Sequence, residues 1–420
     1  MHSTIAVQDL KIGMFIRLEL GWMSHPFPRS SFRITTAEQL ATLRGLGLDR
    51  VMWDPARSET PEDETVTPAP VAEAVPDEAR QAAEARRQAL RTQREDLRRC
   101  EAQFEEAAEA LRLVNANVVA QPASAARQAQ ALSREMLDKM TIDGELCIRL
   151  LSSRSGDRLT AHALNVTVIA MLLGRSLGMA EPEMMDLGTA ALLHDIGKLD
   201  LPDRVHHLDD SFGNAEVKAY RDHVSLGVTR GRQMALPAGA LQVLAQHHEM
   251  ADGTGFPQHL TLEKLSTGSR VVALVNRYDN LCNPGPRGVA LTPHEAVSML
   301  FAQSRSRFDM AVLSGFIRMM GVYPAGSVVQ LTDERYALVM EVNTARPLKP
   351  RVLVHDTHLP RDEALLLDLQ SQPDLGIRRS VPAAKLPPAA ASYLAPRPRV
   401  TYYFDAVRHV ADEPAVAEAA

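Results

Sequence analysis

The first 57 residues alternate short apolar runs with turn-forming residues. Residues 5–7, 14–18 and 50–53 have the length and the apolar content of strands. Between the last two runs, Thr36 precedes a segment with helical spacing and can cap its first turn. This pattern predicts a small α+β module over residues 1–57.

A linker and a long helix are predicted next. Residues 58–76 contain four prolines among acidic side chains, which predicts a flexible linker. Within a predicted amphipathic helical region over 77–121, apolar residues recur every seven positions, at Leu90, Leu97, Phe104 and Leu111. Such a stripe is typical of a coiled coil, so a homodimer through residues 83–118 is one interpretation. A helix that packs on its own domain is the other, because the second stripe contains residues as weak as Cys100 and Ala107.

Helical spacing also dominates residues 122–320, and strand-like runs return after them. We find no convincing strand over 122–320, which predicts an all-α domain. Runs at 327–331, 336–340 and 351–354 predict a small β unit over 321–405, and residues 406–420 are predicted to form a disordered tail. The predicted fold class is mainly α, a helical bundle with a small N-terminal α+β module and a small C-terminal β unit.

Composition limits the classes of function. A chain of 420 residues, 45% hydrophobic and 23% charged, can form two or three domains. Its formal net charge of -6 argues against broad binding of duplex nucleic acid. The three cysteines lie too far apart to suggest a disulfide framework or a thiolate zinc site. Because no apolar run approaches the length of a membrane span and the N-terminus has no basic leader, the sequence predicts a cytoplasmic protein.

Histidines occupy positions where helical spacing calls for apolar residues. Five of the 14 histidines do so: His162, His194, His223, His247 and His248. Asp195 follows one of them directly, and Asn276 and Asp279 share one face of a later apolar helix. A single histidine of this kind is more often a core residue bonded to a backbone carbonyl. Five together predict a shared metal site, because neutral imidazole and carboxylate are good ligands for first-row divalent ions.

These residues, in this order, resemble an HD-GYP domain. The resemblance covers roughly residues 138–320 and includes Gly197 and Lys198 after the His-Asp pair and the Asp-Gly-Thr-Gly-Phe-Pro loop over 252–257. Residues 5–53 are similar to the uncharacterised small domain that often precedes HD-GYP domains in bacterial proteins. The resemblance implies an HD-superfamily bundle with two divalent ions, Fe or Mn, and signal transduction through hydrolysis of cyclic di-GMP. The product would be linear pGpG or GMP, formed by a metal-activated hydroxide.

The resemblance also assigns roles to individual residues. One ion would be held by His162, His194 and Asp195, and the other by Asp195, His223, His247 and His248. Asp195 and Lys198 would act in catalysis, while Lys198 and Arg270 would contact a substrate phosphate. Glu249 or Asp252 would orient ligand imidazoles. The loop of Gly255, Phe256 and Pro257 would contact a partner such as a diguanylate cyclase.

Several positions depart from the family pattern. Asn276 stands where the family has an aspartate ligand. Its amide oxygen can still coordinate the first ion, but it brings no negative charge, so the affinity for that ion should fall. Phe256 replaces the tyrosine of the GYP motif, and residues 204–213 and 283–287 lack the usual lid sequences. Arg158 stands at the place of an acidic ligand of three-metal members, which predicts two metals or fewer. Two alternatives therefore stay open: a weak or inactive signalling module that binds cyclic di-GMP or a diguanylate cyclase, and hydrolysis of another phosphoester.

Overall fold

The computed structural model describes residues 3–406 except 19–26, 28–30, 47, 59–76, 142–144, 152–157, 210 and 304. The chain divides into two compact units, Met1–Gln81 and Ala82–Ala420. Apart from Ser58 and Ala406, the predicted linker over 58–76 and the predicted tail over 406–420 lie outside the described residues.

The N-terminal unit contains a four-stranded antiparallel sheet. Its strands β1 (Ser3–Ala6), β2 (Phe15–Arg17), β3 (Ser31–Arg33) and β4 (Arg50–Asp54) pair in the order β1-β4-β2-β3. Helix α1 (Ala37–Gly45) begins after Thr36, whose side chain accepts a hydrogen bond from the Gln39 backbone N–H as predicted. Ile16, Ile34 and Leu43 belong to a small core of this unit's own. The prediction of an α+β module is confirmed.

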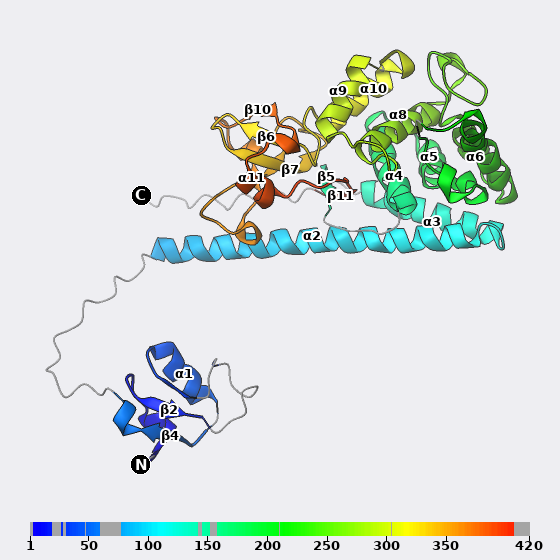
Figure 1. Ribbon diagram of the computed structural model, residues 1–420. Helices are drawn as coiled ribbons and strands as arrows, with labels where there is room; N and C mark the ends of the chain where they lie inside the picture. The colour runs from blue at the N-terminus through cyan, green and yellow to red at the C-terminus, as the bar shows by residue number, and fades with distance from the viewer. Residues whose placement is uncertain are drawn as a thin grey trace, which may run out of the picture. The chain divides into compact units, whose positions relative to one another are not determined.

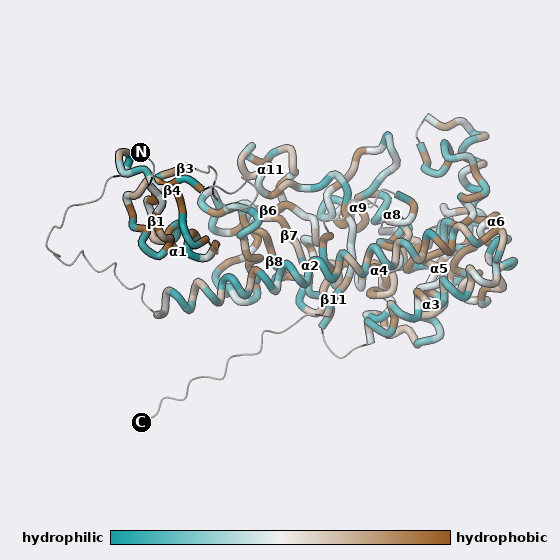
Figure 2. The backbone as a smooth tube through the Cα atoms, turned by 90° about the horizontal axis from the view of Figure 1, so that it is seen from below, coloured by the Kyte–Doolittle hydropathy of each residue, from teal (hydrophilic) through white to brown (hydrophobic). Residues whose placement is uncertain are grey.

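The long helix α2 (Asp77–Asn117) packs on the second unit (Figure 1). Phe104 and Leu111 of the seven-residue stripe are fully buried, and the Phe104 ring meets the Tyr403 ring edge-on at 6.2 Å. Polar Gln93 also helps to hold α2 in place, because its side chain bonds to the backbone of Ala364 and Leu366. Along α2, Figure 2 shows hydrophilic and hydrophobic positions in alternation. The stripe is thus buried within one chain, and a dimer through residues 83–118 stays a prediction.

Eight further helices form the bundle of the second unit. They are α3 (Pro122–Thr141), α4 (Arg158–Ser176), α5 (Glu181–Leu193), α6 (Asn214–Gln233), α7 (Ala238–Gln246), α8 (Thr267–Cys282), α9 (Pro293–Gln303) and α10 (Met310–Met320). Helix α4 packs against α5, α8 and α10. Among the described helices, α4 has the length and composition of a membrane span, but 72% of its apolar window is buried inside the bundle. Its apolar character is therefore that of a core helix.

A seven-stranded antiparallel sheet corrects the prediction of an all-α region over 122–320. The sheet consists of β5 (Leu146–Leu150), β6 (Val328–Leu331), β7 (Tyr336–Asn343), β8 (Arg351–Val354), β9 (Leu367–Asp368), β10 (Ile377–Ser380) and β11 (Tyr402–Ala406). Strand β5 comes from the predicted helical region and pairs with β7 and β11. All five of its residues are buried, and a short run buried on both faces has no period that separates a strand from a helix.

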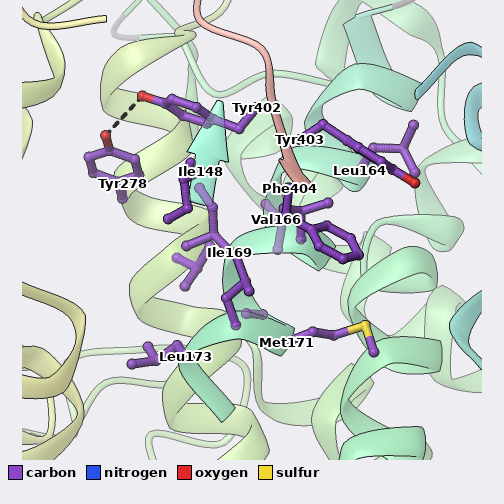
Figure 3. Packing of buried hydrophobic residues seen from close by; sticks show 14 of the residues in the cluster. Ile148, Leu164, Val166, Ile169, Met171, Leu173, Tyr278, Tyr402, Tyr403 and Phe404 are labelled. Carbon is purple, nitrogen blue, oxygen red and sulfur yellow. Dashed lines mark hydrogen bonds between the residues drawn. The ribbon is translucent and has the colours of Figure 1, made fainter. Parts of the chain in front are cut away.

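The last strand brings the end of the described chain back to the bundle. Helix α11 (Pro388–Leu394) precedes it, and the Tyr402 hydroxyl lies 3.0 Å from that of Tyr278 on α8 (Figure 3). Asn165 of α4 donates to the Val400 carbonyl at 3.0 Å and accepts from the Tyr402 N–H at 2.9 Å. These contacts join residues 82–406 into one core, where the sequence predicted separate helical and β domains.

Candidate metal centre

The predicted ligands come from the ends and faces of four helices. His162 lies on the first turns of α4, and His223 lies on α6. His194 and His247 are the residues at which α5 and α7 end, so Asp195 and His248 follow directly in turns. At Gly197, in the 3₁₀ turn Ile196–Asp200, a Cβ atom would collide with the backbone carbonyl of His223. Glycine at this position lets the His-Asp turn approach α6 closely.

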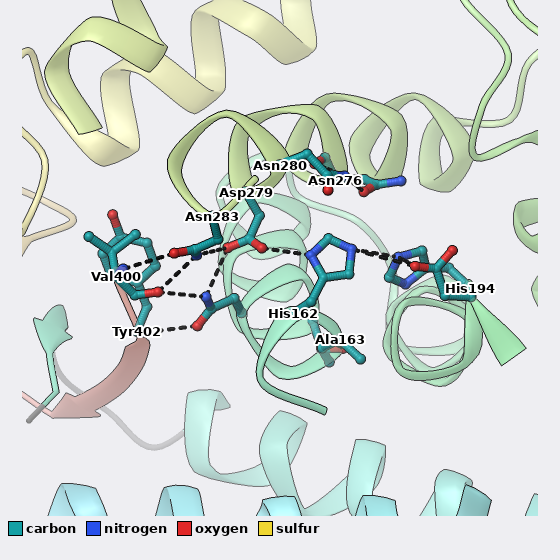
Figure 4. Close-up of polar contacts among 12 residues, drawn as sticks. His162, Ala163, His194, Asn276, Asp279, Asn280, Asn283, Val400 and Tyr402 are labelled. Carbon is teal, nitrogen blue, oxygen red and sulfur yellow. Dashed lines mark hydrogen bonds and ion pairs between the residues drawn. The ribbon is translucent and has the colours of Figure 1, made fainter. Parts of the chain in front are cut away.

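The structure brings these side chains into two overlapping groups. One contains Asp195, His223, His247 and His248, and the other contains His162, His194 and Asp195. The ligand atoms within each group lie within 4.8 Å of one another. The Nε2 atoms of His162 and His194 are 3.2 Å apart (Figure 4). Those of His223 and His247 are 3.3 Å apart. Asp195 belongs to both groups, as the resemblance implies.

Hydrogen bonds at the far side of each ring fix where the protons lie. The Nδ1 atoms of His194, His223 and His247 donate to the backbone carbonyls three residues earlier, those of Ala191, Tyr220 and Leu244. The Nδ1 atom of His162 donates to Asp279 Oδ2 at 2.6 Å. Neutral rings held in this tautomer turn the lone pairs of their Nε2 atoms toward one another.

Converging lone pairs need a cation. Two Nε2 acceptors at about 3.2 Å cannot bond to each other, and metal-bound histidines characteristically donate their other N–H to a carbonyl or a carboxylate. Asp195 Oδ1 and His248 Nε2 are also buried with no hydrogen-bond partner in the described chain. The donor set and its two orphaned acceptors therefore fit divalent metal ions.

The electrostatics of the cluster keep three of its histidines and Asp195 in their metal-binding forms. Burial lowers the pKa of His194 to about 4 and the pKa values of His223 and His247 to about 3. Burial opposes ionisation of Asp195 too, but the Lys198 ammonium and the imidazoles hold its pKa well below the ordinary value. At neutral pH these three rings are thus neutral and the carboxylate is charged, which are the states that coordinate metals.

A cavity of about 920 Å³ opens onto the cluster. Its walls include Lys198, Tyr220, His248, Phe256 and Asn276. The Phe256 ring stacks on the His248 imidazole, with centroids 4.6 Å apart and planes 16° apart. The volume is in the range of small-molecule sites. A substrate in this cavity would contact the ligand group that contains His248, with Lys198 beside it.

Comparison with known families identifies the two parts of the chain. The model of DUF3391, a domain of unknown function, matches residues 2–129, and the HD domain model matches residues 145–312. This chain is an HD-domain protein with a DUF3391 module. The resemblance to HD-GYP proteins is thereby confirmed, and the DUF3391 match extends through α2, well beyond the similarity over residues 5–53.

The relatives of this HD-domain protein include phosphodiesterases of cyclic dinucleotides. Cyclic di-GMP phosphodiesterase PA4108 of Pseudomonas aeruginosa is 28% identical over 365 residues, 84% of this chain and 85% of the relative. The cyclic di-GMP phosphodiesterase response regulator RpfG of Xanthomonas campestris is 30% identical over 40% of this chain and 45% of its own length. The 3'3'-cGAMP-specific phosphodiesterase 3 of Vibrio cholerae is 25% identical over 39% of this chain and 35% of its own length.

The structure gives Arg270 a role different from the predicted contact with a substrate phosphate. Its guanidinium donates to the backbone carbonyls of Leu262 and Leu265 and pairs with Asp309 at 2.8 Å. Arg270 is also absent from the described lining of the cavity. It therefore ties α8 to its neighbours and does not stand at the site entrance.

The loop after His248 has a different internal role from the one predicted. The Glu249 carboxylate accepts from the backbone N–H groups of Gln258 and Leu260, and Asp252 accepts from Thr254. These carboxylates shape the loop, while the imidazoles are oriented by backbone carbonyls and by Asp279. The Phe256 ring stacks on His248, a candidate metal ligand. The contact of this loop with a partner stays a prediction.

Asn276 lies beside the cluster with its amide oxygen engaged. The side chain is 3% exposed, and its Oδ1 accepts a hydrogen bond from Asn280 Nδ2 at 2.5 Å. An aspartate at this position would carry a negative charge and attract a cation, which the neutral amide does not. The amide oxygen that the resemblance places at the first ion is bonded to Asn280 instead.

Sequence reasoning missed two arginines of the HD domain's cavity. Arg277 follows Asn276 on α8, and Arg307 comes from a turn after α9. Burial and the charge of Arg307 lower the pKa of Arg277. Adjacency to Asn276 was the available signal for Arg277, whereas nothing in the local pattern marks Arg307.

Proposed function

We propose that this HD-domain protein is a metal-dependent phosphodiesterase that hydrolyses cyclic di-GMP to linear pGpG or GMP. The carrying observation is the pair of ligand groups that share Asp195, with His248 of one group and the neighbouring Lys198 in the wall of the cavity. Relatives named cyclic di-GMP phosphodiesterases support the substrate, since one of them matches over 85% of its length.

Two divalent ions, Fe or Mn, would be held by the two groups, with Asp195 between them. When bound, such ions supply an activated water and neutralise charge on the phosphate oxygens. The protein's own residues would do the rest. The carbonyls of Ala191, Tyr220 and Leu244 keep the rings in the coordinating tautomer.

Lys198 would connect the metal centre with the substrate. Its Nζ lies 2.6 Å from Asp195 Oδ2 and its side chain forms part of the cavity wall. A lysine ammonium has three donors, so one can hold Asp195 while another donates to a phosphate oxygen. The side chain is also 6% exposed, which strengthens this interaction relative to one in water. Lys198 would thus both orient the bridging carboxylate and bind the scissile phosphate.

A second candidate function is a signalling module that binds cyclic di-GMP without efficient turnover. The engaged amide of Asn276 favours it, because a neutral ligand weakens the first ion. The loop of Gly255, Phe256 and Pro257 would then contact a diguanylate cyclase, with the exposed Pro257 as the accessible residue. Relatives specific for 3'3'-cGAMP also make that dinucleotide a necessary comparison substrate.

The test is a cleavage assay with separated products. The full chain, loaded with Mn²⁺ or Fe²⁺, is incubated with cyclic di-GMP and with 3'3'-cGAMP, and the products are resolved by chromatography. Conversion of cyclic di-GMP to pGpG or GMP supports the enzyme. Bound metal with tight cyclic di-GMP binding and no product supports the signalling module. Cleavage of 3'3'-cGAMP alone would change the substrate but keep the chemistry.

A further inference from the structure

A second cavity of about 730 Å³ adjoins the metal centre on the His162 side. Its lining includes His162 and Asp279 together with the chain segment 395–401 that leads into β11. Lys198, His207 and Asn280 line both this cavity and the larger one. The two cavities therefore meet at the metal centre and can be occupied by one ligand.

The second cavity carries an excess of positive charge. Its described lining includes the four arginines Arg158, Arg361, Arg397 and Arg399. Asp279 is the acidic residue of that described lining, and its oxygens are already bonded to His162, Asn165 and Asn283. The larger cavity differs, because Asp203, Asp209 and Glu216 stand among its arginines. An anion is the ligand that this charge would attract.

Arg158 presents an unsatisfied donor at this cavity. Its Nη1 atom is buried and has no hydrogen-bond partner in the described chain. Burial and the neighbouring charge of Arg399 both lower the pKa of Arg158, so the two guanidinium groups act on each other. A buried cationic N–H without an acceptor, close to a second cation, is the environment that a phosphate oxygen would relieve.

The backbone beside Arg399 is held rigidly. Val400 N–H donates to Asn283 Oδ1 at 2.9 Å, and the Val400 carbonyl accepts from Asn165 and Asn283 (Figure 4). Asn165 and Asn283 also bond to Asp279, which holds the His162 ring. Arg399 itself is exposed and has no ion pair or hydrogen bond of its side chain within the described residues. The segment thus holds the backbone from which an available cation extends beside the metal centre.

We propose that this cavity, the arginine pocket, binds the phosphodiester of a cyclic dinucleotide that is not being cleaved. The inference rests on the proposed function. A cyclic dinucleotide has two phosphodiesters on opposite sides of its ring, so one can lie at the ions while the other keeps its charge and needs a partner. Arg158 and Arg399 would supply charge-assisted hydrogen bonds to it. The chain segment 395–401 would then help to select cyclic dinucleotides over substrates with one phosphate.

Arg399→Gln and Arg158→Gln test this pocket, with Arg318→Gln on the exposed face of α10 as the matched control. The first readout is binding of cyclic di-GMP to the metal-free full chain, measured by titration calorimetry. The second is the KM for cyclic di-GMP compared with the KM for bis(p-nitrophenyl) phosphate, which has one phosphate. We expect each pocket variant to weaken binding by about tenfold or more. The KM for the dinucleotide should rise far more than the KM for the small diester.

Two results would overturn the pocket. One is dinucleotide affinity in both variants equal to that of Arg318→Gln. The other is a parallel rise of both KM values, which would place the arginines at the metal centre itself. Failure of the proposed function looks different, because the wild-type chain would then cleave neither substrate. Circular dichroism and metal content equal to the wild type establish that each variant is folded and loaded.

Discussion

The second unit contains two polar clusters that differ in how their charges and hydrogen-bonding groups are partnered. In the sheet, Glu341 lies between two cations, with Arg149 at 2.7 Å and Arg351 at 2.9 Å, and the Glu341 side chain is 4% exposed. In the bundle, imidazole nitrogens and the Asp195 carboxylate face one another, with Lys198 as the cation in direct contact. The carboxylate of the sheet cluster is paired with cations of the same chain. The bundle cluster brings together several hydrogen-bond acceptors.

This difference separates a structural site from a metal site. A buried carboxylate between two guanidinium groups is stable without a ligand, because its negative charge is met by cations of the chain. Four imidazoles whose N–H groups all point outward have no counterpart for their lone pairs. Burial alone therefore does not identify function. The direction of donors and acceptors does.

The largest expected effect comes from removing the shared ligand. His194→Ala/Asp195→Ala deletes donors from both groups, so metal-dependent cleavage of cyclic di-GMP should fall to background. The matched control is His355→Ala/Asp356→Ala, which removes the same residue pair from the β unit outside the site and should keep wild-type turnover. Chromatographic product analysis decides between them. Turnover that survives in the first double variant would refute the assignment.

The sheet cluster should respond in stability instead of activity. Glu341→Ala leaves the Arg149 guanidinium buried without its partner, which should lower the free energy of unfolding by about 3–5 kcal/mol. The measurement is urea denaturation. Metal content per folded chain should stay at the wild-type value. Loss of metal without loss of stability would contradict the distinction between the two clusters.

Acid should destabilise the metal-free chain through the bundle cluster. His194 has a folded-state pKa of about 4, and His223 and His247 of about 3, against an ordinary value of 6.5. Between these values the unfolded chain binds more protons than the folded chain, so stability falls as pH decreases from about 6.5 toward 4. Urea midpoints of the chelated protein at successive pH values measure this. A flat profile over that window would show that the rings are not buried as neutral acceptors.

The smallest effect is expected for a substitution of Asn276, which lies beside the candidate metal ligands. Asn276→Asp adds a carboxylate beside the first ligand group and should raise affinity for the more weakly bound ion by about tenfold. Turnover should rise with it if the protein is a weakened enzyme. Competition with a metal-binding indicator gives the affinity. Unchanged affinity would mean that Asn280 holds this side chain away from the ion, since it bonds to the amide now.

The sequence allowed the metal centre to be predicted better than the surfaces around it. Helical spacing fixes the direction of a side chain, so His162 and His223 could be placed inward before any contact was known. The substrate side depends on long-range contacts that spacing does not contain. Arg270 was misassigned because Asp309, its ion-pair partner, lies on a different segment. Arg158 and Arg399 come together where Asn165 and Asn283 bond to the backbone of the segment that leads into β11, a long-range contact of the same kind.

The most direct test of the metal centre is the number of ions that each chain holds. The wild-type protein is purified, supplied with Mn²⁺ or Fe²⁺, dialysed, and analysed by inductively coupled plasma mass spectrometry beside His194→Ala/Asp195→Ala. We predict about two ions per wild-type chain and almost none in the double variant. Equal metal content in the two proteins, or a wild-type chain that binds no metal, would contradict the account.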